Sequence, residues 1–171
     1  MAFKEYMIKR KKTFADTVLT VLLYLAAFVI GIVVFALLMP YNVGGIALLI
    51  IAGAFYGAYI LSSRFNKEFE YIITDDNVDI DVIMNRSRRK RLISFSMEDT
   101  EIIASVKDPA YSEYQSRQYD KKIDATTGRK DADVYFAVVD KKGKNIVMFE
   151  PPYNALTMLG QFARSKVHIY E

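Results

Sequence analysis

Cysteine is absent from the 171 residues of this sequence, and histidine occurs once. Without cysteine the chain cannot form disulfides, thiolate nucleophiles or zinc sites built on cysteine, which fits a domain facing a reducing compartment. The one histidine, His168, lies near the C-terminus and would have to serve any Ser-His-Asp constellation by itself, so we expect an ordinary surface residue there. P-loop, GxGxxG and GxSxG motifs are also missing. We therefore expect no enzyme and no cofactor.

The segment that begins at Asp75 has the first half of a calcium-binding loop but not the second. Asp75, Asn77 and Asp79 occupy the first three ligand positions. The sixth position holds Ile80 where such loops need glycine, and the twelfth holds Arg86 where they need glutamate. We expect a solvated turn and no metal site.

Charged residues and histidine are also missing from residues 17–61, which form two apolar segments, 17–39 and 43–61. As helices these segments would be roughly 35 Å and roughly 28 Å long, against about 30 Å for the hydrocarbon core of a bilayer. A soluble protein rarely contains helices that are apolar on all sides, and two in tandem would need more chain to cover them than remains. The pattern predicts a transmembrane helical hairpin. Because neither segment contains a charged residue, it predicts no ion path or proton relay.

Basic residues flank this hairpin on one side only. Lys4 and residues 9–12 precede the first segment, Arg64 and Lys67 follow the second, and the connecting loop has none. The positive-inside rule then places both ends in the cytoplasm, so we expect a multi-pass protein of the cell membrane with cytoplasmic N- and C-termini. For residues 1–16 two interpretations remain: a solvated basic anchor, which we favour, and a short helix lying on the membrane surface.

Small residues recur at four-residue spacing in both apolar segments: Ala27 and Gly31 in the first, Gly53 and Gly57 in the second. Such pairs let helix backbones approach closely in a membrane, where dispersion contacts replace the hydrophobic effect. We expect them to pack the hairpin together. The alternative is a homodimer formed through residues 53–57.

The apolar period changes to two after Lys67, which indicates β-strands. Pro151 and Pro152 end this region, and Asn154 can cap an amphipathic helix over residues 155–166. The sequence thus divides into a basic segment (1–16), a hairpin (17–61) and a mainly β domain (67–171). The strands are predicted at 69–74, 78–84, 91–97, 100–106, 134–139 and 145–149, with one more near 113–119.

Two stretches of the last domain carry a resemblance. In RLISFSMEDTEII, residues 91–103, a strand runs into the acidic pair Glu98 and Asp99, and in FEP, residues 149–151, a strand leads toward the final helix. In this order residues 67–171 resemble the bacterial pleckstrin-homology-like (PH-like) domains that follow a membrane hairpin in small bacterial membrane proteins. The resemblance implies a strongly bent antiparallel sheet capped by a C-terminal helix, used as a platform for lipid head groups or proteins. It supplies no shared catalytic residues, and the polar insertion at 107–133 departs from a compact version of the fold.

The strongest local charge feature is a run of five cations in six positions, at a predicted turn between strands. Guanidinium groups fork onto phosphate oxygens, so such a turn could dock on anionic lipid head groups of the cytoplasmic leaflet. The alternative is a solvated turn balanced by acids, namely Asp75, Asp76, Asp79 and Asp81. The run consists of Arg86, Arg88, Arg89, Lys90 and Arg91.

Tyrosines in the polar insertion suggest a different function. Tyr111, Tyr114 and Tyr119 could contact a protein partner, because tyrosine brings a large contact area at low entropic cost.

Residues 62–171 carry eighteen basic and eighteen acidic side chains, which gives no support for nucleic-acid binding. We expect a non-enzymatic, membrane-anchored scaffold or regulator that docks on anionic lipid. The alternative is an accessory subunit that binds a partner protein through its cytoplasmic domain.

Overall fold

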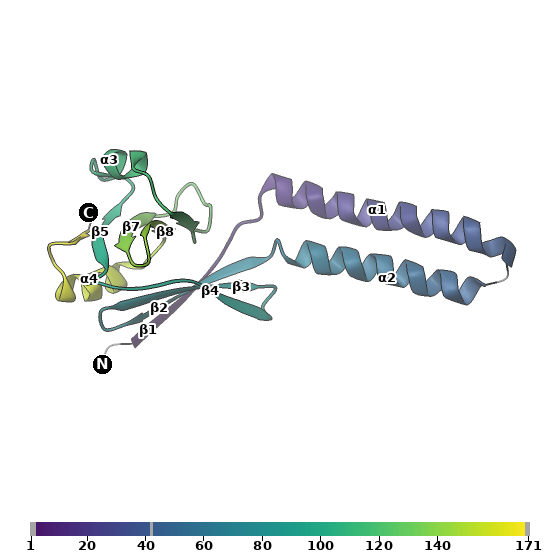
Figure 1. Ribbon diagram of the computed structural model, residues 1–171, viewed down its shortest axis with the longest axis horizontal. Helices are drawn as coiled ribbons and strands as arrows, with labels where there is room; N and C mark the ends of the chain where they lie inside the picture. The colour runs from purple at the N-terminus through teal and green to yellow at the C-terminus, as the bar shows by residue number, and fades with distance from the viewer. Residues whose placement is uncertain (1–2, 42, 170–171) are drawn as a thin grey trace. The chain divides into compact units, whose positions relative to one another are not determined.

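The computed structural model describes residues 3–41 and 43–169, which belong to two units (Figure 1). One unit combines Met1–Lys11 with Glu68–Glu171, and the other is Lys12–Lys67. The predicted segments 1–16 and 67–171 and the predicted loop each include a few positions, residues 1–2, 42 and 170–171, that lie outside the described residues.

The second unit is a pair of helices, α1 (Phe14–Leu38) and α2 (Gly44–Ser63), joined through the short 3-10 helix η1 (Met39–Tyr41). Figure 1 shows α1 and α2 running side by side. Both are long and apolar enough, by length and composition, to cross a membrane. Helix α1 begins earlier than predicted because Thr13 and Asp16 form a capping box: the Thr13 hydroxyl accepts from the Asp16 amide at 3.2 Å, and the Asp16 carboxylate accepts from the Thr13 amide at 2.9 Å.

Small residues bring the two helices together, but not all of those that were predicted. Ala27 and Gly31 are buried on α1, and a Cβ atom at Gly31 would lie 3.6 Å from the side chain of Ile51 on α2. A Cβ atom at Gly53 or at Gly57 would meet no neighbouring atom within 4 Å, so these two glycines do not line the contact. The prediction that they pack the hairpin is therefore corrected. The buried residues of α2 are Ala47 and Ala58, and their stripe runs along a different face of the helix.

The first sheet contains β1 (Phe3–Lys9), β2 (Lys67–Thr74), β3 (Asn77–Met84) and β4 (Arg88–Ser96), in that order. Strand β1 pairs antiparallel with β2, from Phe3 opposite Thr74 to Lys9 opposite Glu68. The helix pair is thus an insertion between two neighbouring strands. The sequence led us to expect either a solvated basic anchor or a surface helix here. Residues 3–9 are instead a strand, whose alternation places Tyr6 and Ile8 against the core.

The second sheet has the order β6-β8-β7-β5-β9. Its long strands β5, β7 and β8 are antiparallel, but the short edge strands β6 and β9 run parallel to their neighbours, so the sheet is mixed where an antiparallel one was expected. Its strands are β5 (Thr100–Ser105), β6 (Lys121–Asp124), β7 (Tyr135–Asp140), β8 (Lys144–Phe149) and β9 (Val167–His168).

Six predicted strands are confirmed as β2 to β5, β7 and β8, and three other expectations are corrected. Strand β4 begins at Arg88, so most of the basic run lies in a strand, and the turn before it is shorter than predicted. The strand predicted at 113–119 is instead the helix α3 (Tyr111–Ser116). The final helix α4 (Tyr153–Phe162) has Pro152, not Asn154, at its N-cap, and the Asn154 side chain, now inside the first turn, accepts a hydrogen bond from the Tyr6 hydroxyl at 2.9 Å.

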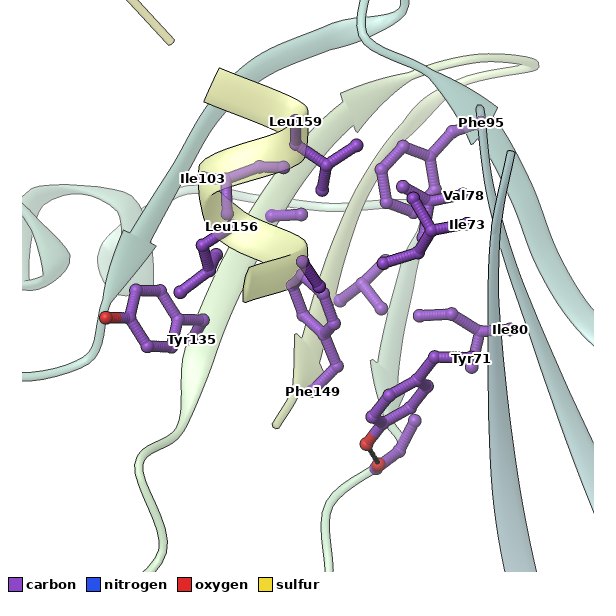
Figure 2. Close-up of a cluster of buried hydrophobic side chains, with 14 of the residues drawn as sticks. Tyr71, Ile73, Val78, Ile80, Phe95, Ile103, Tyr135, Phe149, Leu156 and Leu159 are labelled. Atoms are coloured by element: carbon purple, nitrogen blue, oxygen red, sulfur yellow. Dashed lines mark hydrogen bonds between the residues drawn. The ribbon is translucent and has the colours of Figure 1, made fainter. Parts of the chain in front are cut away.

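The main core lies between the two sheets and α4 (Figure 2). Its side chains include Ile73 and Phe95 from the first sheet, Ile103 and Phe149 from the second, and Leu156 from α4. The rings of Tyr71 and Phe149 meet edge to face at 5.9 Å, and the Tyr71 hydroxyl donates to the Ala125 carbonyl at 2.5 Å. Burial raises the pKa of Tyr71 above its ordinary value, so the phenol stays protonated.

Candidate functional site

The first sheet has one end from which the chain runs into α1 and to which it returns from α2. Because neighbouring strands are antiparallel, this helix-proximal end also carries the β3–β4 turn: Lys9 is paired with Glu68, and Met84 with Arg88. The Arg86 Nε atom lies 3.4 Å from the Glu68 carboxylate, which joins the turn to the start of β2. The basic run predicted from the sequence therefore lies at the end of the sheet from which the chain leaves for α1 and to which it returns from α2.

A loop from the second sheet reaches the same end. The Lys11 amide donates to the Thr127 carbonyl at 2.8 Å. Thr127 in turn donates through its amide and its hydroxyl to the Glu150 carboxylate, at 2.7 and 2.9 Å. These bonds hold the loop after β6 next to the segment that leads into α1, and Arg129 and Lys130 follow Thr127 on this loop by two and three positions.

The five cations of the basic run divide into two groups. Arg89 bonds to Glu70 on β2 and lies 3.5 Å from Asp81 on β3, while Arg91 contacts Asp79 at 2.7 Å and bonds to Asp81. Glu70 and Asp81 are only 1% and 2% exposed, so the arginines lie over two buried carboxylates. The hydrogen bond to Asp81 raises the pKa of Arg91. These guanidinium groups are already engaged with carboxylates, which compete with any anionic ligand.

Arg88 and Lys90 form the second group. Both are exposed, and neither has an ion-pair partner among the described residues. They alternate along β4 with Arg89 and Arg91 and so lie on the other side of the strand. That the run from Arg86 to Arg91 binds a ligand stays a prediction, and these two residues are its members without an ion-pair partner among the described residues. The alternative, neutralisation by acids, applies to the other three, with Glu68, Glu70, Asp79 and Asp81 as the acids.

The predicted partner-binding tyrosines pack on the second sheet instead of standing free. The rings of Tyr111 and Tyr114 lie 5.1 and 5.6 Å from that of Phe136 on β7, and the Tyr119 hydroxyl donates to the Tyr114 carbonyl at 2.8 Å. The Arg117 guanidinium lies 4.2 Å above the Tyr114 ring. Helix α3 thus covers the outer face of this sheet, and the tyrosines are half-buried parts of a second apolar cluster.

Both the strands and the inserted helix pair fall within a match to a known family. The family model described as Bacterial PH-like domain (DUF6106) matches residues 2–169. The chain belongs to this family. The match starts before β1 and runs through both helices, whereas the resemblance seen in the sequence covered only residues 67–171. No curated protein and no solved structure matches the chain.

Six exposed basic side chains lie at, or on the loop that reaches, the helix-proximal end of the PH-like domain. None of the six has an ion-pair partner within residues 3–41 and 43–169. Sequence reasoning missed Arg129 and Lys130, because only the bond between Lys11 and Thr127 brings their loop to this end. We call the set the basic rim: Lys9, Lys11, Arg88, Lys90, Arg129 and Lys130.

The PH-like domain also has a cleft of about 490 Å³ between the end of β5, the start of β7 and the link from β8 to α4. Its floor includes the buried residues Ser105, Tyr135 and Leu156. Its mouth carries an exposed ion pair, Lys107 with Asp133, at 2.9 Å. The remaining lining residues are Glu150, Pro151, Pro152 and Tyr153. No sequence pattern predicted this cleft, because its walls come from three separate stretches of the chain.

Proposed function

We propose that this chain is a non-catalytic protein of the cell membrane, in which α1 and α2 span the bilayer and the PH-like domain docks on anionic lipid head groups of the cytoplasmic leaflet through the basic rim. The pairing of β1 with β2 carries the proposal, because it ties the basic end of the domain to both ends of the helix pair. In this function the protein is a membrane-anchored scaffold or regulator.

Strand pairing supports the orientation that the basic residues predict. Lys9 and Glu68 are neighbours in one sheet, so the inserted helix pair starts and ends on the same side of the membrane. The basic residues on either side of it favour the cytoplasm for that side by the positive-inside rule. Both termini belong to the PH-like domain and are then cytoplasmic.

Chain length keeps the rim close to the lipid, whatever the orientation of the domain. Phe14, the first residue of α1, comes five positions after Lys9, which spans at most about 18 Å of extended chain. Lys67 follows Ser63, the last residue of α2, by four positions, or at most about 14 Å. Each Lys or Arg near an anionic leaflet contributes on the order of 1 kcal/mol, so six rim cations are enough to orient a tethered domain.

Hydrogen exchange of the full chain in lipid nanodiscs tests this proposal. In discs rich in phosphatidylglycerol, amides at 85–90 and 126–131 should exchange more slowly than in discs of phosphatidylcholine. Raised salt should remove the difference. The double substitution Arg88→Gln with Lys90→Gln should abolish the protection at 85–90. As a matched control, Lys121→Gln with Lys122→Gln changes two exposed cations on β6 and should have no effect. Equal exchange in both lipids would refute docking.

The second candidate function is that of an accessory subunit which binds a partner protein. The partner would then bind at a surface other than the tyrosines. Tyr111 and Tyr114 are packed against Phe136 and offer little free area. The cleft beside Tyr135 and Glu150 is the feature that favours a partner.

A further inference from the structure

The cleft of the PH-like domain is lined by a tyrosine whose ring is buried and whose hydroxyl makes no hydrogen bond with the described residues. Tyr135 is 6% exposed, and its hydroxyl makes no hydrogen bond with residues 3–41 or 43–169. Figure 2 shows this hydroxyl pointing away from the cluster of apolar side chains to which the ring belongs. Because this oxygen reaches the open cleft and is not engaged within the described residues, it is available to a ligand as a hydrogen-bond acceptor.

The charge of the cleft is negative. Lys107 and Asp133 at the mouth neutralise each other, which leaves the carboxylate of Glu150. One oxygen of that carboxylate, Oε1, accepts both hydrogen bonds from Thr127, so the side chain is held in place. A fixed carboxylate and a free phenol oxygen are both acceptors, and the group that suits them is a cation with several N–H donors.

The walls suit the stem that carries such a cation. Pro151 and Leu156 are buried and apolar, and the exposed ring of Tyr153 lies at the edge. The methylene chain of arginine or lysine packs on surfaces of this kind while its head reaches polar groups, and an aromatic face attracts the cation. We propose that the cleft binds an arginine or lysine side chain of a partner protein. This proposal rests on the cleft alone and does not depend on docking to lipid.

A phospholipid amine is a poorer occupant than a protein side chain. Its ammonium is linked through two carbons to a phosphate, which would need a cation of its own in the cleft. The one cation in the lining, Lys107, is paired with Asp133, and the phosphate would lie beside Asp133 and Glu150. Like charges at this separation repel, whereas a peptide brings no such group.

Amide chemical shifts of the full chain in neutral detergent micelles test the proposal, with acetyl-Gly-Arg-Gly-amide as the probe and its citrulline counterpart as the uncharged isostere. The arginine peptide should shift the amides of Ser105, Tyr135 and Tyr153 in a saturable manner. The citrulline peptide should bind at least about tenfold more weakly, since it lacks the charge-assisted hydrogen bond.

Two substitutions should weaken binding by about the same factor. Tyr135→Phe removes a hydroxyl that makes no hydrogen bond with residues 3–41 or 43–169, and Glu150→Gln keeps a carbonyl oxygen for Thr127, so both variants should fold. Glu98→Gln removes an exposed charge outside the cleft and should bind normally. Equal binding of the two peptides, equal loss in the Glu98 variant, or displacement of the arginine peptide by phosphatidylethanolamine would overturn the proposal.

Discussion

Replacing the helix pair by a tight turn should convert β1 and β2 into an ordinary β-hairpin. Lys9 and Glu68 are partners at the end of the ladder, so an Asn-Gly turn between them closes the gap that residues 10–67 now fill. The resulting chain, 3–9 joined to 68–169, should be a soluble, folded PH-like domain. A matched chain, 67–169 alone, lacks β1 and should be much less stable.

The contribution of β1 can be worked out from its contacts. Tyr6 and Ile8 are half-buried against the core, and each contributes about 1 kcal/mol, half the value of a fully buried side chain. The hydrogen bond from Tyr6 to Asn154 adds about 1 kcal/mol. Tyr71 and Ile73, which are fully buried beside β1, would also lose cover. Removing β1 should therefore lower the free energy of unfolding by about 3 to 5 kcal/mol, out of a typical 5 to 15 kcal/mol.

Urea unfolding followed by far-ultraviolet circular dichroism measures this difference. The turn-joined chain should unfold in one cooperative transition, and the chain without β1 should have a clearly lower midpoint or no transition. If 67–169 is as stable as the turn-joined chain, β1 is not a structural part of the domain and the reasoning fails.

Three further predictions concern single positions. Arg89→Met should destabilise the domain by about 2 kcal/mol, less than the loss of a fully buried ion pair would, because the Arg89 side chain is 52% exposed. Arg88→Met, the control, should change the stability by less than about 0.5 kcal/mol. Equal effects of the two substitutions in urea unfolding would contradict the pairing of Arg89 with Glu70. The backbone hydrogen bond from Ser96 lowers the pKa of Asp99, so its stabilising effect is present above its unfolded pKa and is lost as the pH falls through the lower folded value. Asp99→Asn should thus cost about 1 kcal/mol at neutral pH and progressively less as the pH falls through the lowered pKa of Asp99, and a pH-independent cost would refute the assignment. Since the chain has no native cysteine, Tyr41→Cys should react with an impermeant maleimide in intact cells and Ser112→Cys only after lysis; the reverse pattern would invert the proposed topology.

Local patterns in the sequence determined a large part of this protein. The apolar segments, six of the strands and a final helix follow from periodicity within a short window, and the order of those elements was enough to indicate the PH-like family. The main error at this level was the assignment of one short segment to the wrong type of secondary structure. The three tyrosines of residues 111–119 fit a strand by composition, but all three pack against the apolar cluster on the second sheet from a segment that begins with a short helix.

Tertiary structure alone decided which distant residues meet. Strand β1 joins β2 across the whole helix pair, and the Tyr6 hydroxyl bonds to Asn154, 148 positions away. Arg89 and Arg91 form ion pairs within the domain because β2 and β3 bring buried carboxylates next to them. Register and strand order set these contacts. Both depend on how the two sheets pack around a shared core. The pattern of polar and apolar residues along the chain does not determine which distant segments pair in that packing.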